Sequence, residues 1–172
     1  MVNAPREVGG LTLPAINHIG VVVHNRDEAI RRYAESLGIG PFRAFDAEFP
    51  DLRATEGTPP SRLRIAFGNL GVILFEVIEP GEGPSIHRDF LERHGEGIQH
   101  IGFVVPDLAA DLAKLEANGL NILLHAAIPG FNSMLVYVEG EAAHGAIVEL
   151  IQESPEMLAF YQRLWDRTRR PA

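Results

Sequence analysis

The sequence predicts an α+β fold in which two tandem β-α-β-β-β modules form one curved mixed sheet around a cup, followed by a C-terminal helix. The first observation is a duplication, since INHIGVVV at residues 16–23 returns as IQHIGFVV at residues 98–105. The second is that one helical pattern and three strand patterns follow each copy. A single module would leave one face of its sheet bare, whereas two modules can bury that face and curl around a cavity.

Each repeated segment leads into a predicted helix, over residues 27–37 in the first half and 108–118 in the second. Apolar residues recur at helical spacing in both ranges. Each range has an aspartate that could cap its start and a glycine that could cap its end: Asp27 and Gly38, and Asp107 and Gly119. These signals predict matching helices in the two halves.

Three predicted strands follow each helix, separated by turns rich in Gly, Pro and Asn. The predicted strands cover residues 42–45, 63–67 and 71–78 in the first half, and 122–126, 134–138 and 146–151 in the second. We therefore interpret residues 1–172 as one domain. Its parts are module one at about 14–80, a linker at 81–97, module two at about 98–153 and a C-terminal helix at 154–170.

Two predicted helices lie outside the modules. The linker contains a short helical stretch over residues 85–94. A Ser-Pro start signal at Ser154 and an apolar stripe predict the helix over 154–170. We expect this last helix to pack on the outside of the sheet or on a partner subunit.

Composition and charge exclude several classes of protein. The 172-residue chain has a net charge of −8, which argues against the basic face of a nucleic-acid-binding protein. It contains no cysteine, so any metal must be bound by His, Asp, Glu or backbone oxygen. No apolar run approaches the roughly 20 residues of a membrane span, and the N-terminus lacks a signal-peptide pattern. We therefore expect a cytoplasmic protein that binds neither nucleic acid nor membrane.

A second repeat places a carboxylate inside an apolar strand of each half. LFEVIEP contains Glu76 and IVELIQE contains Glu149, while His18 and His100 stand at the head of the first repeat. Taken alone, such a histidine is more often a core residue and such a glutamate is more often exposed. A buried carboxylate is costly unless it is paired or bound to a metal, and the joint repetition favours one metal site built by all four residues.

The donor set indicates the kind of metal. Two imidazoles and two carboxylates suit one divalent ion such as Zn, Ni, Co, Mn or Fe better than Ca. Four protein ligands leave two positions of an octahedron open for water or substrate, which favours a catalytic site over a structural one.

Four segments of the chain resemble the vicinal oxygen chelate superfamily: HIGVVV, RIAFGNLGVILFEVIEP, FLERHGEGIQHIGFVV and GAIVELIQ. This superfamily includes glyoxalase I, methylmalonyl-CoA epimerase, extradiol dioxygenases and bleomycin-resistance proteins. The resemblance covers about residues 15–152, is greatest to the epimerases, and implies that the metal ligands are His18, Glu76, His100 and Glu149. Two departures from the epimerase pattern are Arg64, where one bacterial pattern has an acid, and VYVEGEAAHG in place of a Phe-x-His-Pro turn.

The resemblance also implies a reaction, which is proton abstraction next to a carbonyl with a metal-stabilised enolate. Glu149 is the expected base and Glu76 its counterpart, and an acyl-CoA thioester is the candidate substrate of an epimerase. A lactoylglutathione lyase-like enzyme acting on a thiol adduct is the first alternative. A small-molecule binding or resistance protein and a ring-cleaving dioxygenase are the others. The family's habit predicts a homodimer.

Other residues are weaker candidates for the cavity. His144 could face it, whereas we expect four histidines at the surface or in loops: His24, His87, His94 and His125. Four arginines could hold an anionic substrate such as a CoA phosphate, although solvated loop charges are the simpler interpretation: Arg43, Arg53, Arg62 and Arg64. Five apolar residues could line the cavity or belong to the core: Phe42, Phe67, Phe103, Phe131 and Met134.

Overall fold

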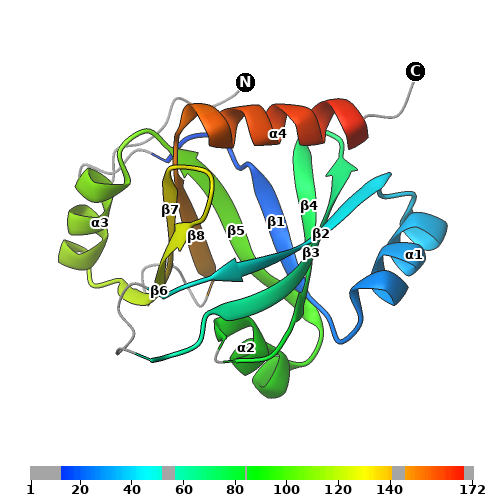
Figure 1. Cartoon of the computed structure of the whole chain (residues 1–172), viewed down its shortest axis with the longest axis horizontal. Helices are drawn as coiled ribbons and strands as arrows, with labels where there is room; N and C mark the ends of the chain where they lie inside the picture. The colour runs from blue at the N-terminus through cyan, green and yellow to red at the C-terminus, as the bar shows by residue number, and fades with distance from the viewer. Residues whose placement is uncertain (1–12, 52–56, 84, 141–145, 169–172) are drawn as a thin grey trace.

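The computed structural model describes residues 13–51, 57–83, 85–140 and 146–168 (Figure 1). Strands and helices follow one another as predicted, with one β-α-β-β-β module in each half, α2 between them and α4 at the end. The elements are β1 His18–Val22, α1 Arg26–Leu37, β2 Phe42–Phe49, β3 Ser61–Leu70, β4 Ile73–Pro80, α2 Ile86–His94, β5 Gly97–Val105, α3 Leu108–Ala117, β6 Asn121–Ile128, β7 Ser133–Glu139, β8 Ile147–Gln152 and α4 Pro155–Thr168.

The eight strands in the described part of the chain form one mixed sheet, in the order β2-β3-β4-β1-β5-β8-β7-β6. Within each half, the first strand pairs in parallel with the last, β1 with β4 and β5 with β8. The halves join where β1 and β5 pair antiparallel. An isolated bridge between Asp51 and Ala126 connects the region after β2 to β6, so the sheet curls into a half-barrel (Figure 1). The predicted α+β fold with a curved mixed sheet is confirmed.

Strand β4 shows how the sheet separates its two faces. Leu74 and Ile78 point to the inner side and belong to the main core, whereas Phe75 and Val77 pack on the other side, in the core cluster that includes residues of α1. Because side chains alternate along a strand, Glu76 must share the inner face with Leu74 and Ile78. The alternation therefore places a carboxylate inside the cup.

The helix ends agree with the sequence in part. Asp107 caps α3, and Gly38 ends α1 in the left-handed conformation with φ 67°. Gly119, with φ 76°, directly follows the residue that caps the end of α3. The prediction that Asp27 caps α1 is wrong, because the Asn25 side chain accepts the backbone N–H three residues later. Asn25 stands one residue before the helix, where a side-chain acceptor can reach that N–H.

The C-terminal helix α4 packs against the inner face of the sheet, contrary to the expectation that it lies outside. Met157, Tyr161 and Leu164 are buried and share the main core with Ile65 and Phe67 of β3. Figure 1 shows α4 lying across one end of the curled sheet. The inner face offers an apolar surface that the stripe of one helix can cover. Within the described ranges, no helix has both the length and the apolar character needed to cross a membrane.

Candidate metal centre

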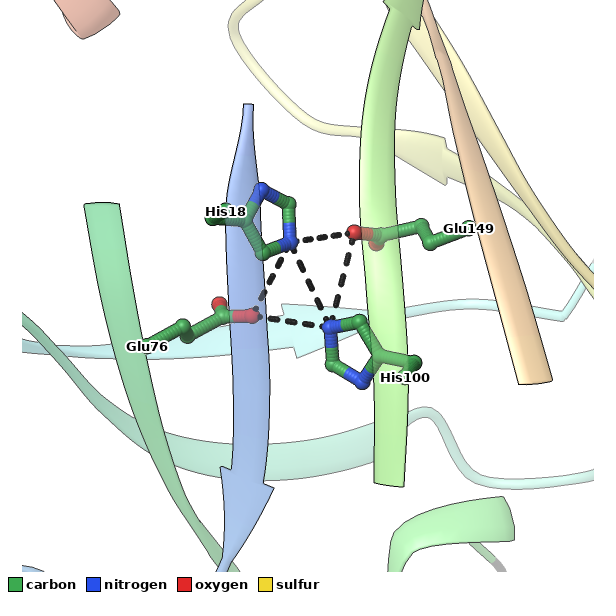
Figure 2. A group of neighbouring side chains, drawn as sticks. All are labelled: His18, Glu76, His100 and Glu149. Atoms are coloured by element: carbon green, nitrogen blue, oxygen red, sulfur yellow. Dashed lines mark hydrogen bonds and ion pairs between the residues drawn. The ribbon is translucent and has the colours of Figure 1, made fainter. Parts of the chain in front are cut away.

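Four side chains predicted from the two repeats converge inside the cup (Figure 2). His18 comes from β1, Glu76 from β4, His100 from β5 and Glu149 from β8. The exposed fraction of each residue is 6% or less. One ligand atom from each residue lies within 4.8 Å of the other three. The two halves therefore contribute the same pair of donors to one buried point.

The distances between the facing atoms fit a single coordination shell. Nε2 of His18 lies 2.8 Å from Oε2 of Glu149 and 3.4 Å from Oε2 of Glu76. Nε2 of His100 lies 3.2 Å from Oε2 of Glu76 and 3.7 Å from Oε2 of Glu149, and the two Nε2 atoms are 3.3 Å apart. Ligands about 2.1 Å from one ion lie about 3.0 Å apart at 90° and about 3.4 Å apart at a tetrahedral angle. The cluster is consistent with one divalent ion.

A hydrogen bond on the far side of each imidazole orients the ring. Nδ1 of His18 lies 3.0 Å from Oδ1 of Asn17, and Nδ1 of His100 lies 3.1 Å from Oε1 of Gln99. Gln99 donates its own amide N–H to the carbonyl of Ile86, which turns Oε1 toward the histidine. An imidazole that donates from Nδ1 keeps the lone pair of Nε2 for a metal. The sequence analysis missed Asn17 and Gln99, although an amide residue directly precedes the histidine in both repeats.

The glycine of each His-Ile-Gly repeat makes room for the histidine of the other half. Gly20 of β1 is the register partner of His100, and Gly102 of β5 is the register partner of His18. A Cβ atom added at Gly20 would come closer than 3.0 Å to the His100 ring, and one added at Gly102 equally close to the His18 ring. The repeat is therefore a reciprocal arrangement in which each half supplies one imidazole and the space for the other.

Comparison with known proteins agrees with the fold. Residues 17–138 match the Glyoxalase/Bleomycin resistance protein/Dioxygenase superfamily. The chain belongs to this superfamily. It is also 26% identical over 138 residues to the uncharacterized protein YqjC of Bacillus subtilis, a match that covers 80% of this chain and 91% of that protein.

Solved structures of methylmalonyl-CoA epimerases share the superfamily fold with this chain. A Streptomyces coelicolor epimerase variant in complex with 2-nitronate-propionyl-CoA is 23% identical, with a TM-score of 0.63 over 84% of this chain and 97% of that one. The Mycobacterium tuberculosis epimerase is also 23% identical, with a TM-score of 0.61 over 86% of this chain and 93% of that one. The superfamily match ends at residue 138, before Glu149 and α4.

The charges of the cluster favour a cation at its centre. In the described part of the chain, the ion-pair partners of Glu76 and Glu149 are His18 and His100. Burial lowers the pKa of His18, but the hydrogen bond with Glu149 and the charges of both carboxylates outweigh it and raise that pKa. Burial raises the pKa of Glu149, but the hydrogen bond and charge of His18 outweigh it and lower that pKa to about 2. A proton and a divalent ion therefore compete for the same position.

His87 is buried beside this cluster, so the expectation that it lies at the surface or in a loop is wrong. Its exposed fraction is 1%, and its Nδ1 lies 2.6 Å from Oε1 of Gln99. Burial and the charge of His100 lower its pKa to about 4. Its Nε2 has no hydrogen-bond partner among the described protein atoms, and the residue lines a cavity of about 30 Å³ together with Tyr137 and Glu149.

A larger cavity of about 260 Å³ lies beside His18, Glu76 and Glu149. Most of its wall is aromatic or aliphatic, and three of the lining residues come from α4. Of the five apolar candidates from the sequence, Phe67 and Phe131 line this cavity. Phe42 and Phe103 pack in core clusters, which is the other alternative that the sequence left open. Met134 has an exposed fraction of 36% and lines no part of this cavity.

The remaining sequence candidates that the structure describes do not line this cavity. Arg62 pairs with Glu48, Arg64 pairs with Glu79 and Asp27, and Arg43 is exposed. His24 and His94 are exposed as expected, whereas His125 is half-buried in β6. Two candidates, Arg53 and His144, lie outside the described residues.

Proposed function

We propose that this protein is a divalent-metal-dependent enzyme that removes a proton next to a carbonyl group, with His18, Glu76, His100 and Glu149 as the metal ligands. One observation carries the proposal. Two carboxylates from corresponding strands of the two halves face a single ion-sized position beside an apolar cavity. A divalent ion held there supplies Lewis-acid polarisation of the substrate oxygen.

Glu149 is the proposed base. Its contact with His18 is what holds its pKa at about 2, against the effect of burial. That contact belongs to the metal-free protein. In the metal-loaded protein, a Glu149 carboxylate that leaves the ion would be governed mainly by burial, which raises its pKa toward that of a useful base. Tyr137 also forms a hydrogen bond with Glu149 and can hold the carboxylate in place once it has moved.

Glu76 is the proposed counterpart that returns the proton. In the sheet, β4 and β8 lie on opposite sides of the central β1–β5 pair, so Glu76 and Glu149 approach the cluster from opposite sides (Figure 2). A substrate between them presents one face to each carboxylate. Removal by one and return by the other inverts the carbon, which is an epimerisation. An acyl thioester is the proposed substrate class, because its α-proton is more acidic than that of an ester, and a Lewis acid at its carbonyl oxygen would bring that proton within reach of a carboxylate base.

Solvent exchange tests this proposal. Chelator-treated protein is reloaded with Co, Ni, Zn, Mn or Fe and incubated in D₂O with acyl-CoA thioesters, and deuterium at the α-carbon is measured by mass spectrometry. We expect metal-dependent exchange that falls at least about 100-fold in Glu149→Gln, the usual loss when a general base is removed. Glu76→Gln should slow inversion more than exchange, because the first proton transfer survives.

Two controls separate a lost base from a lost metal. The metal content of each variant is measured, since both glutamates are also proposed ligands. Glu48→Gln changes a carboxylate that lines the cavity but pairs with Arg62 outside the cluster, and it should keep exchange. Undiminished exchange in metal-loaded Glu149→Gln would overturn the assignment of the base. Tight binding without exchange of any thioester would favour the small-molecule-binding alternative.

A further inference from the structure

We propose that the substrate of this site carries a compact aromatic group, which an aromatic chamber closed by α4 holds beside the metal cluster. The chamber is the cavity of about 260 Å³, with Phe45, Phe67, Phe131, Met157, Phe160 and Tyr161 in its wall. This inference rests on the proposed function for the reactive end of the substrate. It adds the chemical class of the part of the substrate that lies away from the reactive carbon.

The rings of the chamber form one connected network, with Phe160 of α4 at its centre. The Phe160 ring centroid lies 5.7 Å from that of Phe45, 5.2 Å from that of Phe131 and 5.5 Å from that of Tyr161. Phe45 and Phe67 stack at 6.1 Å with an interplanar angle of 20°. Aromatic pairs prefer such offset-stacked or edge-to-face contacts, which add to the effect of buried area. A wall of this kind favours a flat ring over an aliphatic chain.

The chamber adjoins the metal cluster directly. The Phe67 ring meets the His18 ring edge-on at a centroid distance of 5.7 Å, and His18, Glu76 and Glu149 form part of the same wall. An apolar cavity of roughly 150 Å³ can hold benzene. The larger volume here fits one ring joined by a short link to a carbonyl group at the cluster, and it is far too small for coenzyme A.

The charge of the wall argues against an anionic group. Besides Tyr161, the charged or titratable residues among the described residues of the wall are His18, Asp46, Glu48, Glu76 and Glu149. No lysine or arginine of the described ranges lines the chamber, so nothing in this wall pairs with a phosphate or a carboxylate. The phosphates of a carrier such as coenzyme A therefore find no partner in this wall. Asp46 and Glu48 are already paired with Arg26 and Arg62, so the group that enters the chamber needs no charge of its own.

Helix α4 supplies the selective part of this wall. Met157, Phe160 and Tyr161 all come from α4, which follows the segment that matches the superfamily. Leu158 of the same helix has an exposed fraction of 46% and does not belong to the wall. Phe160, inside the chamber, and Leu158, outside it, are therefore a matched pair of positions for substitution.

Two pairs of compounds that differ by a phenyl group test the inference on the metal-loaded protein. The pairs are phenylacetyl-CoA with acetyl-CoA, and phenylpyruvate with pyruvate. Binding is followed by the fluorescence of Trp165, the single tryptophan of the chain, which packs against the core shared with α4. Exchange into D₂O is measured in parallel. We expect the phenyl member of each pair to bind at least about tenfold more tightly, because its ring is removed from water.

Substitutions in α4 test whether this helix causes the tighter binding of the phenyl compounds. Phe160→Ala should reduce the phenyl preference about tenfold, Phe160→Leu should reduce it less because it keeps apolar volume, and Leu158→Ala should keep the wild-type ratio. The measured quantity is the ratio of two affinities, so a general loss of activity does not change it. Thermal unfolding of each variant identifies a failure to fold, and Phe160→Leu then carries the test.

The outcomes distinguish this inference from the proposed function. Equal or tighter binding of the aliphatic members would overturn the aromatic chamber, even if those compounds exchange their protons. Free coenzyme A that binds as tightly as phenylacetyl-CoA would overturn it as well. Binding of the phenyl compounds without exchange of any compound would support the chamber and overturn proton abstraction.

Discussion

His87 should make the metal-free protein lose stability in mild acid. The ring is buried, its Nδ1 hydrogen-bonds to Gln99, and its pKa in the folded protein is about 4. In the unfolded chain its pKa is about 6.5. Between these values the unfolded state binds a proton that the folded state does not. The stability therefore falls as the pH is lowered from 7 to 5.

The size of this loss follows from the two pKa values. At pH 5 the protonated form of His87 exceeds the neutral form about thirtyfold in the unfolded chain, whereas the folded residue is still mostly neutral. This ratio corresponds to about 2 kcal/mol of stability, a large share of the roughly 5–15 kcal/mol typical of a domain. His18 acts in the opposite sense, because its raised pKa gives a contribution that is present in acid and is lost as the pH rises through the folded value.

The assay compares wild type with His87→Gln in the presence of chelator, by urea unfolding at pH 7 and pH 5. Groups that do not interact with His87, His18 among them, contribute equally to both proteins and cancel in the difference. Wild type should lose about 2 kcal/mol more than His87→Gln over this range. His24→Gln, which changes an exposed histidine, should behave as wild type. An equal loss in wild type and His87→Gln would refute the reasoning.

Two further predictions concern the supports of the cluster, and a third concerns Arg64, which lies outside it. Gln99→Leu should weaken metal binding about 10–100-fold in calorimetry, because the His100 ring loses the oxygen that orients it, and unchanged affinity would contradict that role. Gly20→Ala should displace the His100 ring and abolish tight metal binding, a result checked by metal analysis of the folded variant. Arg64→Gln should lower the free energy of unfolding by about 1 kcal/mol, because Arg64 pairs with Glu79. It should leave KM unchanged in steady-state kinetics, and a raised KM would show that Arg64 binds substrate.

The sequence predicts the fold and the cluster because both are duplicated. A histidine or a glutamate in one strand has several ordinary explanations, but the same pair at corresponding points of two halves has few. The structure brings His18, Glu76, His100 and Glu149 together as the repeat implies. The supporting amides, Asn17 and Gln99, also lie within the repeats, where their position next to each histidine could have indicated their role.

The placement of α4 and the burial of His87 depend on contacts between distant segments, which local patterns do not encode. The apolar stripe of α4 shows that one face of the helix is covered, but both sides of a sheet can cover it. His87 stands in the first turn of a short helix, where polar residues are common. It is buried only because α2 packs beside β5, where Gln99 accepts its hydrogen bond.

The two halves supply equal ligands, but the surroundings of the two glutamates are unequal. Glu149 has a hydrogen bond with Tyr137 and lies 2.8 Å from His18, whereas the shortest contact of Glu76 with a histidine is 3.2 Å, to His100. Helix α4 adds a further asymmetry, because α2, which follows the first module as α4 follows the second, is shorter and contributes no residue to the chamber. A twofold ligand set alone would let a substrate bind in two equivalent orientations. The chamber lined by α4 and the hydrogen bond between Tyr137 and Glu149 remove that equivalence. The substrate then binds in one orientation, with its reactive carbon next to Glu149.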